Sequence, residues 1–494
     1  MLIVGVAIGW LAVWTLLAQP DLDEAVPEPP SSATEEPAPP PADGPEAQLD
    51  STSPQPKEDP PEADPGPQLP EASANHVAHL EALLESEDLE EVQELSVIVI
   101  DEHGREVVSR DPDLPVTPAS TNKLLTAAAA LRLLGPDYRH VTRAYAVGEV
   151  TDGVLAGDLL LVGSGDPALA SPRYAQEVYP ARPHTPIDDL AAAVEANGIS
   201  EITGAVRGDA RLFADEPVAE GWVDRYFANL DATRVSGLTV DAGRRLLERG
   251  DDLHAEVAED PALHTATVMT DLLGDRDIKV AGEPAVGGAG APAREIARIQ
   301  SPPLADLLAH VVQTSDNHMA DGLFRTLGAL AGRNEGTWAD SETTVRRVLG
   351  DLDHDWTEIV LADGSGLSRD DRLPASLLAE LDRTMFTENA NEWQPLMAVA
   401  GERGTLRGRL RGTVAEGRLA GKTGALRDTR ALTGHVIATD GRRYHFAILG
   451  SGLDGNGLQA VRALMDDVVL LLAGGEPPCT PAELDDDGDC PPFG

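Results

Sequence analysis

The spacing of hydrophobic residues changes several times along the chain, and each change predicts a different secondary structure. Apolar residues that recur every three or four positions predict helices at 76–89, 120–134, 187–196, 261–273, 303–312 and 458–472. Short apolar runs bounded by turn residues predict strands at 95–100, 105–109, 143–147, 154–162, 202–207, 419–425, 432–439 and 444–449. Helices around an antiparallel sheet indicate an α+β fold.

The pattern also divides the chain into regions. Short strand-like pieces dominate 138–260, which predicts a mostly β module inserted into a second domain made of 75–137 and 261–474. Residues 19–74 are rich in Pro, Glu and Asp, which is typical of a disordered linker.

Both ends of the chain carry signals of an extracytoplasmic protein. Residues 1–18 are apolar and uncharged, which fits a signal peptide or a membrane anchor, and a poor cleavage site favours the anchor. Residues 475–494 form an acidic tail with the chain's two cysteines, Cys479 and Cys490. The pair predicts a small disulfide formed in an oxidising compartment, although two unrelated thiols remain the alternative.

Charge and composition exclude several classes of partner. The formal net charge of -46 argues against nucleic acid, because phosphate binding needs clustered Lys and Arg. Two cysteines without nearby histidines do not complete a zinc site, and the acidic run at 485–489 lacks the spaced ligands of a calcium loop. We therefore expect no metal and no cofactor.

Lysine is scarce, and two of the four lysines lie in short motifs. The motifs are Ser120-Thr121-Asn122-Lys123, Ser315-Asp316-Asn317 and Lys422-Thr423-Gly424. In this order they form the S-x-x-K, S-D-N and K-T-G signature of penicillin-binding proteins and β-lactamases. With so few lysines, a chance match to all three is on the order of one in several thousand.

The first two motifs supply a nucleophile and its proton carriers. Ser120 and Lys123 lie three residues apart, so a helix places them on one face. Lys123 can act as a base only when neutral, and burial or a nearby positive Lys422 would lower its pKa. Ser315 can relay a proton to the leaving amine, and the N–H of Ser120 can donate to an oxyanion.

The remaining motif residues can hold the substrate. Asn317 can bond a substrate amide, while Lys422 and Thr423 at a strand edge can bind a carboxylate. Gly424 permits close approach of the backbone. The N–H of Ala425 would complete the oxyanion hole.

With these motifs the chain resembles penicillin-binding protein 4-type D-alanyl-D-alanine carboxypeptidases/endopeptidases, the peptidase S13 family, over about 76–474. The family is similar in carrying a long insertion between the first two motifs, and 157–159, 163–167 and 363–369 also look like family segments. The resemblance implies a transpeptidase/β-lactamase-like domain split by the insertion. It also implies peptidoglycan stem peptides as substrates, cleaved through an acyl-enzyme on Ser120, and β-lactam antibiotics as inhibitors. More weakly, it implies that Asp209 and Arg369 grip the far end of a diaminopimelate-type stem peptide.

Two other functions remain open at this point. A β-lactamase would need an activated water for deacylation, and the nearest candidate glutamate, Glu388, has the wrong spacing. A wall-binding protein that has lost activity is the non-enzymatic alternative, which the full set of motif side chains disfavours.

Overall fold

The computed structural model describes residues 71–249, 252–288, 293–331, 336–352 and 354–474. The predicted anchor at 1–18, almost all of the predicted linker, and the tail with Cys479 and Cys490 lie outside these residues. Helix α1 (Glu71–Leu84) begins within the last residues of the predicted linker. Within the described ranges, no helix is both long and apolar enough to cross a membrane.

One sheet is antiparallel throughout and has six strands. In spatial order they are β14 (Ala398–Val399), β15 (Leu419–Leu426), β16 (Thr429–Ile437), β17 (Arg443–Ser451), β1 (Glu94–Asp101) and β2 (Glu106–Arg110). The sheet joins segments from both ends of the described chain, because β1 pairs with β17. The predicted hairpin at 432–449 corresponds to β16 and β17.

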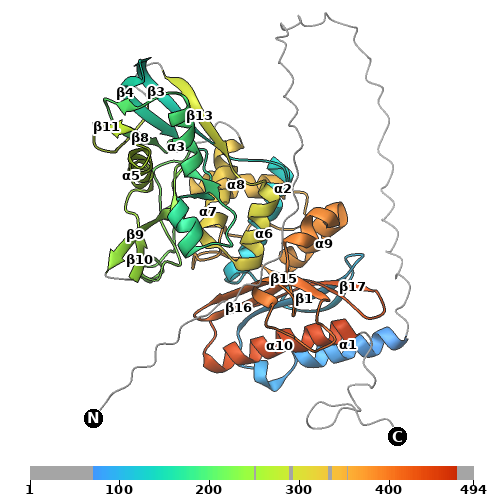
Figure 1. The fold of residues 1–494 in the computed structure, drawn as a ribbon. Helices are drawn as coiled ribbons and strands as arrows, with labels where there is room; N and C mark the ends of the chain where they lie inside the picture. Colours follow the sequence, from blue (N-terminus) through green and yellow to red (C-terminus); the bar gives the residue numbers. More distant parts are fainter. Residues whose placement is uncertain (1–70, 250–251, 289–292, 332–335, 353, 475–494) are drawn as a thin grey trace, which may run out of the picture. The chain divides into compact units, whose positions relative to one another are not determined.

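Helices cover both faces of this sheet (Figure 1). Helices α1 and α10 (Gly455–Gly474) lie on one face, and α9 (Ala375–Trp393) lies on the other. Strand β1 shows that both faces of the sheet are apolar. Val97 and Val99 pack into one core with α10, while Ile98 and Ile100 pack into a second core with α9. Side chains alternate between faces along a strand, so a continuous apolar run fits a sheet buried on both sides.

Further helices pack on the α9 side and enlarge that core. They are α2 (Lys123–Leu134), α6 (Leu304–Thr314), α7 (Asn317–Leu330) and α8 (Trp338–Val348). Short 3₁₀ turns flank the main elements: η1 (Glu87–Leu89), η2 (Ala119–Asn122), η5 (Gln394–Leu396) and η6 (Gly404–Leu406). The predicted helix at 120–134 is thus a 3₁₀ turn followed by α2.

The inserted module has a seven-stranded mixed sheet. Its main path runs through β11 (Lys279–Val280), β7 (Glu201–Ile202), β4 (Val154–Val162), β3 (Val141–Thr151) and β13 (Arg294–Gln300), while β8 (Val206–Asp209) joins β4 and β12 (Ala285–Val286). Its other elements are β5 (Leu169–Ala170), η3 (Tyr174–Val178), β6 (Thr185–Pro186), α3 (Ile187–Ala196), α4 (Asp224–Ala228), η4 (Asp241–Gly243), β9 (Arg244–Arg249), β10 (Asp252–Val257) and α5 (Pro261–Gly274).

The module extends further along the chain than the sequence pattern predicted. We placed its end at residue 260, but α5 packs into the core of the module and β13 pairs with β3. Helical periodicity shows that α5 has an apolar face, yet it does not show which sheet that face covers. We therefore propose 138–300 as the inserted module.

Candidate active site

Ser120 lies in a turn that is held tightly from two sides. Ala119, directly before it, has a φ of 49°, which is uncommon for a residue with a side chain. A Cβ on Gly366 would lie 1.9 Å from the carbonyl oxygen of Ala119, and one on Gly424 would lie 2.8 Å from that of Pro118. The two glycines thus let a loop and strand β15 approach the turn, and these neighbours hold its strained backbone.

Lys123 is fully buried beside the serine hydroxyl. Its Nζ lies 3.1 Å from Ser120 Oγ, and it donates to Asn317 Oδ1 at 2.8 Å and to the carbonyl of Ser365 at 2.6 Å. Burial lowers the pKa of Lys123 to about 8, although nearby carboxylates, Asp321 foremost, raise it. The geometry and the lowered pKa suit a base that acts on Ser120.

The second motif meets the third opposite Lys123. Ser315 is in the left-handed region with a φ of 67°, at the junction between α6 and α7. Lys422 Nζ donates to Ser315 Oγ at 3.0 Å and to the carbonyl of Thr423 at 2.8 Å. Burial, followed by the positive charge of Lys123, lowers the pKa of Lys422 well below its usual value.

Strand β15 presents an edge beside the serine turn. Its neighbour β14 pairs with Ala420 and Gly421 only, so no described strand pairs with that edge of β15 beyond Gly421. The hydroxyl of Thr423 donates to that of Thr405 at 2.8 Å. An extended substrate can therefore bind along this edge by adding to the sheet.

A cleft of about 350 Å³ opens at this edge. Four of the predicted site residues line it: Ser120, Ser315, Asn317 and Ala425. It is also lined by Leu367 of the segment 363–369, and by six residues that the sequence analysis did not single out: Arg225, Tyr226, Asn229, Asp231, Leu426 and Arg427.

The glycine-rich segment 363–369 forms part of the site, although its local pattern indicates only a turn. The carboxylate of Asp363 accepts bonds from the backbone N–H groups of Ser365, Gly366 and Ser368, and from the indole of Trp222 at 2.7 Å. These bonds fix the loop that holds the Ser365 carbonyl against Lys123. In the local sequence, the density of turn residues was the only signal for this loop.

Three other residues from the sequence analysis lie elsewhere or are already paired. Asp209 is buried in β8, and Arg211 donates to its carboxylate at 2.8 and 2.7 Å. Arg369 donates to both carboxylate oxygens of Asp428 at 2.6 and 2.7 Å. Neither Asp209 nor Arg369 lines the cleft, and the described contacts do not bring them together. Glu388 pairs with Arg132 at 2.6 Å on α9.

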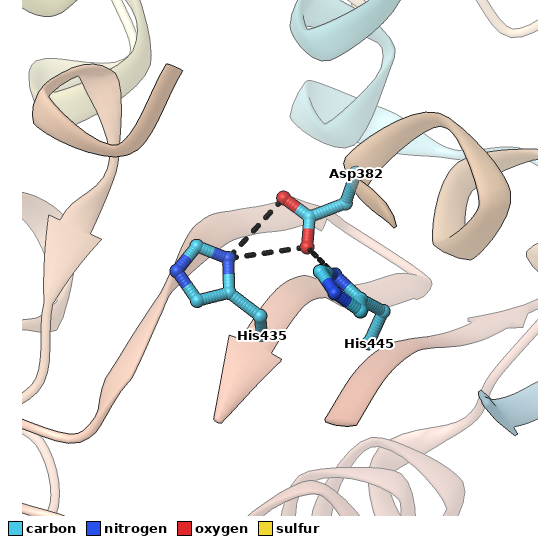
Figure 2. A group of neighbouring side chains, drawn as sticks. All are labelled: Asp382, His435 and His445. Carbon is cyan, nitrogen blue, oxygen red and sulfur yellow. Dashed lines mark hydrogen bonds and ion pairs between the residues drawn. The ribbon is translucent and has the colours of Figure 1, made fainter. Parts of the chain in front are cut away.

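A buried cluster between α9 and the sheet has the side chains of a metal site. In Asp382, His435 and His445, one ligand atom each lies within 4.8 Å of the others (Figure 2). The Asp382 carboxylate is 2.6 Å from His445 Nδ1 and 3.1 Å from His435 Nδ1, and Trp393 donates to it at 2.8 Å. These are hydrogen-bond distances, so hydrogen bonds explain why the three side chains lie together. The bonds connect α9 to β16 and β17.

Known peptidases share sequence with this chain over most of its length. The model of the D-Ala-D-Ala carboxypeptidase 3 (S13) family matches residues 76–251 and 248–472. A Mycobacterium tuberculosis carboxypeptidase is 32% identical over 375 residues, covering 73% of this chain and 77% of that protein. A D-alanyl-D-alanine carboxypeptidase of an Actinomadura species is 28% identical over 484 residues, covering 82% of this chain and 87% of that protein.

Solved structures show the same fold. Penicillin-binding protein 4 from Haemophilus influenzae superposes with a TM-score of 0.68 at 20% identity, covering 79% of this chain and 99% of that one. The fold and the sequence matches define a peptidase built on a transpeptidase-like domain. The chain belongs to the D-Ala-D-Ala carboxypeptidase 3 (S13) family. This confirms the resemblance and the fold class that the motifs predicted.

Proposed function

We propose that this peptidase is a serine DD-carboxypeptidase that acts on peptidoglycan stem peptides through an acyl-enzyme on Ser120; cleavage of cross-links, the second activity that the family resemblance implies, is tested below with muropeptides. Family membership supports the substrate class. The observation that carries the mechanism is the buried Nζ of Lys123, 3.1 Å from Ser120 Oγ. Serine is a weak nucleophile without such a base.

Acylation uses the groups that face the cleft. Neutral Lys123 takes the proton of Ser120 as its Oγ attacks the carbonyl carbon of the penultimate D-Ala. The N–H groups of Ser120 and Ala425 stabilise the oxyanion. The proton that Lys123 has taken passes through the hydroxyl of Ser315 to the leaving nitrogen, the C–N bond breaks, D-Ala departs, and Lys123 is neutral again. A water molecule then attacks the ester, with Lys123 as the base.

The substrate is held along β15. Its terminal carboxylate lies at Lys422 and Thr423, and Asn317 bonds a backbone amide. Burial favours neutral Lys422 in the empty cleft, but an incoming carboxylate favours the charged form. Binding of the correct C-terminus therefore charges Lys422.

The same serine is the proposed target of β-lactam antibiotics. A β-lactam places its strained amide where the D-Ala-D-Ala bond lies and acylates Ser120. The substrate also requires a location outside the cytoplasm, with 1–18 as the proposed membrane anchor.

Release of D-Ala tests the proposal. The protein is incubated with diacetyl-Lys-D-Ala-D-Ala and with cross-linked muropeptides, and products are measured by mass spectrometry. We expect Ser120→Ala to abolish release and Lys123→Ala to reduce it by roughly 10²–10⁴-fold. Lys279→Ala, at an exposed lysine of the inserted module, is the matched control and should leave release unchanged. Release by Ser120→Ala at the wild-type rate would refute the mechanism.

Two further assays distinguish the alternatives. Sustained turnover of nitrocefin would identify a β-lactamase, whereas one slow stoichiometric burst supports the carboxypeptidase. A folded protein that never reacts with a fluorescent penicillin would be a wall-binding protein.

A further inference from the structure

The middle residue of the second motif, Asp316, is absent from the lining of the cleft that holds its neighbours Ser315 and Asn317. One carboxylate oxygen of Asp316 caps helix α7 by accepting the N–H of Met319 at 2.9 Å. The other oxygen accepts Arg182 Nε at 2.8 Å and lies 3.2 Å from His310 Nε2. Asp316 is thus an anchor, and one of its bonds crosses to the inserted module.

Arg182 comes from the module segment between η3 and β6, and only 3% of it is exposed. Its Nη1 and Nη2 are buried and have no hydrogen-bond partner among the described residues. Asp316 is the one described carboxylate that forms an ion pair with it. A buried guanidinium is stable only when its charge is compensated, so the pair with Asp316 fixes the distance between the module and the motif.

The residues on either side of Asp316 contact the two buried lysines. Ser315 Oγ accepts from Lys422, and Asn317 Oδ1 accepts from Lys123. Ser315 holds a left-handed backbone conformation, which persists only where its surroundings impose it. Asp316 is the next residue, and its carboxylate is the group that Arg182 binds.

We propose that Arg182 is a positioning residue, through which the inserted module sets the geometry of Ser315 and Asn317 against Lys422 and Lys123. The inference rests on the proposed function, since it concerns the same acylation step. It gives the module a role in catalysis although Arg182 does not line the cleft.

The pair also affects the charge around Lys123. The charged groups that act on this lysine come from α7, from the loop and bridge at 363–371 and from the second motif: Asp321, Asp363, Asp371 and Asp316. Lys422 on β15 faces the same site, where burial favours its neutral form. Arg182 partly neutralises Asp316. Without Arg182, the negative charge of Asp316 raises the pKa of Lys123 further, and the acidic limb of the acylation profile moves to higher pH.

The test compares acylation by a fluorescent penicillin in four proteins: wild type, Arg182→Met, Arg182→Lys and Arg276→Met. The last is a matched control, because Arg276 pairs with Asp188 within the module. The limiting acylation rate and the penicillin dissociation constant are measured separately from pH 6 to 10, at temperatures where circular dichroism shows each protein folded.

For Arg182→Met we expect a limiting rate lower by roughly 10- to 100-fold, a nearly unchanged dissociation constant, and an acidic limb at higher pH. Arg182→Lys should be intermediate, because lysine keeps the charge but has no donor at the position of Nε, which makes the bond to Asp316. Arg276→Met should match wild type.

The outcomes separate the two proposals. A folded Arg182→Met with the wild-type rate and profile overturns this inference, even if its melting temperature is lower, because a merely structural role predicts that result. If Arg182→Met does not fold, Arg182→Lys decides: a wild-type rate and profile overturn the inference. A wild-type protein that neither reacts with penicillin nor releases D-Ala overturns the proposed function itself.

Discussion

The pH dependence of acylation reports directly on the buried Lys123. In water a lysine has a pKa near 10.5, and burial in this site lowers the pKa to about 8. The difference means that folding disfavours the charged form by on the order of 3 kcal/mol. Because the base must be neutral, acylation should rise with pH through about 8 and then level off.

The size of the rise distinguishes this site from one with an ordinary lysine. With a pKa of about 8, roughly a tenth of the protein has neutral Lys123 at pH 7 and about nine tenths at pH 9. The acylation rate should therefore increase about tenfold over this range. An unperturbed lysine would give about a hundredfold increase with no plateau by pH 9.

Stopped-flow measurement of penicillin acylation, confirmed by intact mass, gives this profile. The two buried lysines titrate as an interacting pair, so the apparent pKa belongs to both. Lys279→Ala is the control, because this lysine is exposed and should leave the profile unchanged. A rate that is flat from pH 6 to 9, or that still climbs tenfold per pH unit above 9, would refute the assignment of Lys123 as base.

Two structural predictions complete the set. Gly424→Ala places a Cβ 2.8 Å from the carbonyl oxygen of Pro118 and should slow acylation by roughly 10²-fold. Gly274→Ala is the control and should not slow acylation, because a Cβ there meets nothing within 4 Å. Equal acylation rates of the two variants in stopped flow would contradict the close approach of β15 to the serine turn. Asp382→Asn removes a carboxylate that satisfies three buried donors and should lower the free energy of unfolding by about 3–5 kcal/mol in urea titrations. Asp440→Asn, at an exposed ion pair, should lower the free energy of unfolding by at most about 1 kcal/mol. An equal loss of stability in both variants would show that the buried cluster does not stabilise the fold more than an exposed ion pair does.

Helices α8 and α9 show where reading the sequence failed. Both escaped prediction because their buried faces contain polar residues, which interrupt the apolar stripe. Ser341 and Thr344 are buried in α8, and Asp382 is buried in α9 against two histidines from the sheet. Ser341 donates to the carbonyl of Thr337 one turn earlier, whereas the partners of Asp382 lie 53 and 63 positions away, and local periodicity contains no information on such distant partners.

The sequence by itself determined the family, the fold class and the types of side chain in the three motifs. It also determined the contact between Ser120 and Lys123, because a spacing of three within one helical turn is a local geometry. The tertiary structure alone decided which distant groups complete the site. Asn317 meets Lys123 across 194 positions, and Arg182 meets Asp316 across 134. Such contacts depend on how sheets and helices pack, which no short stretch of residues specifies.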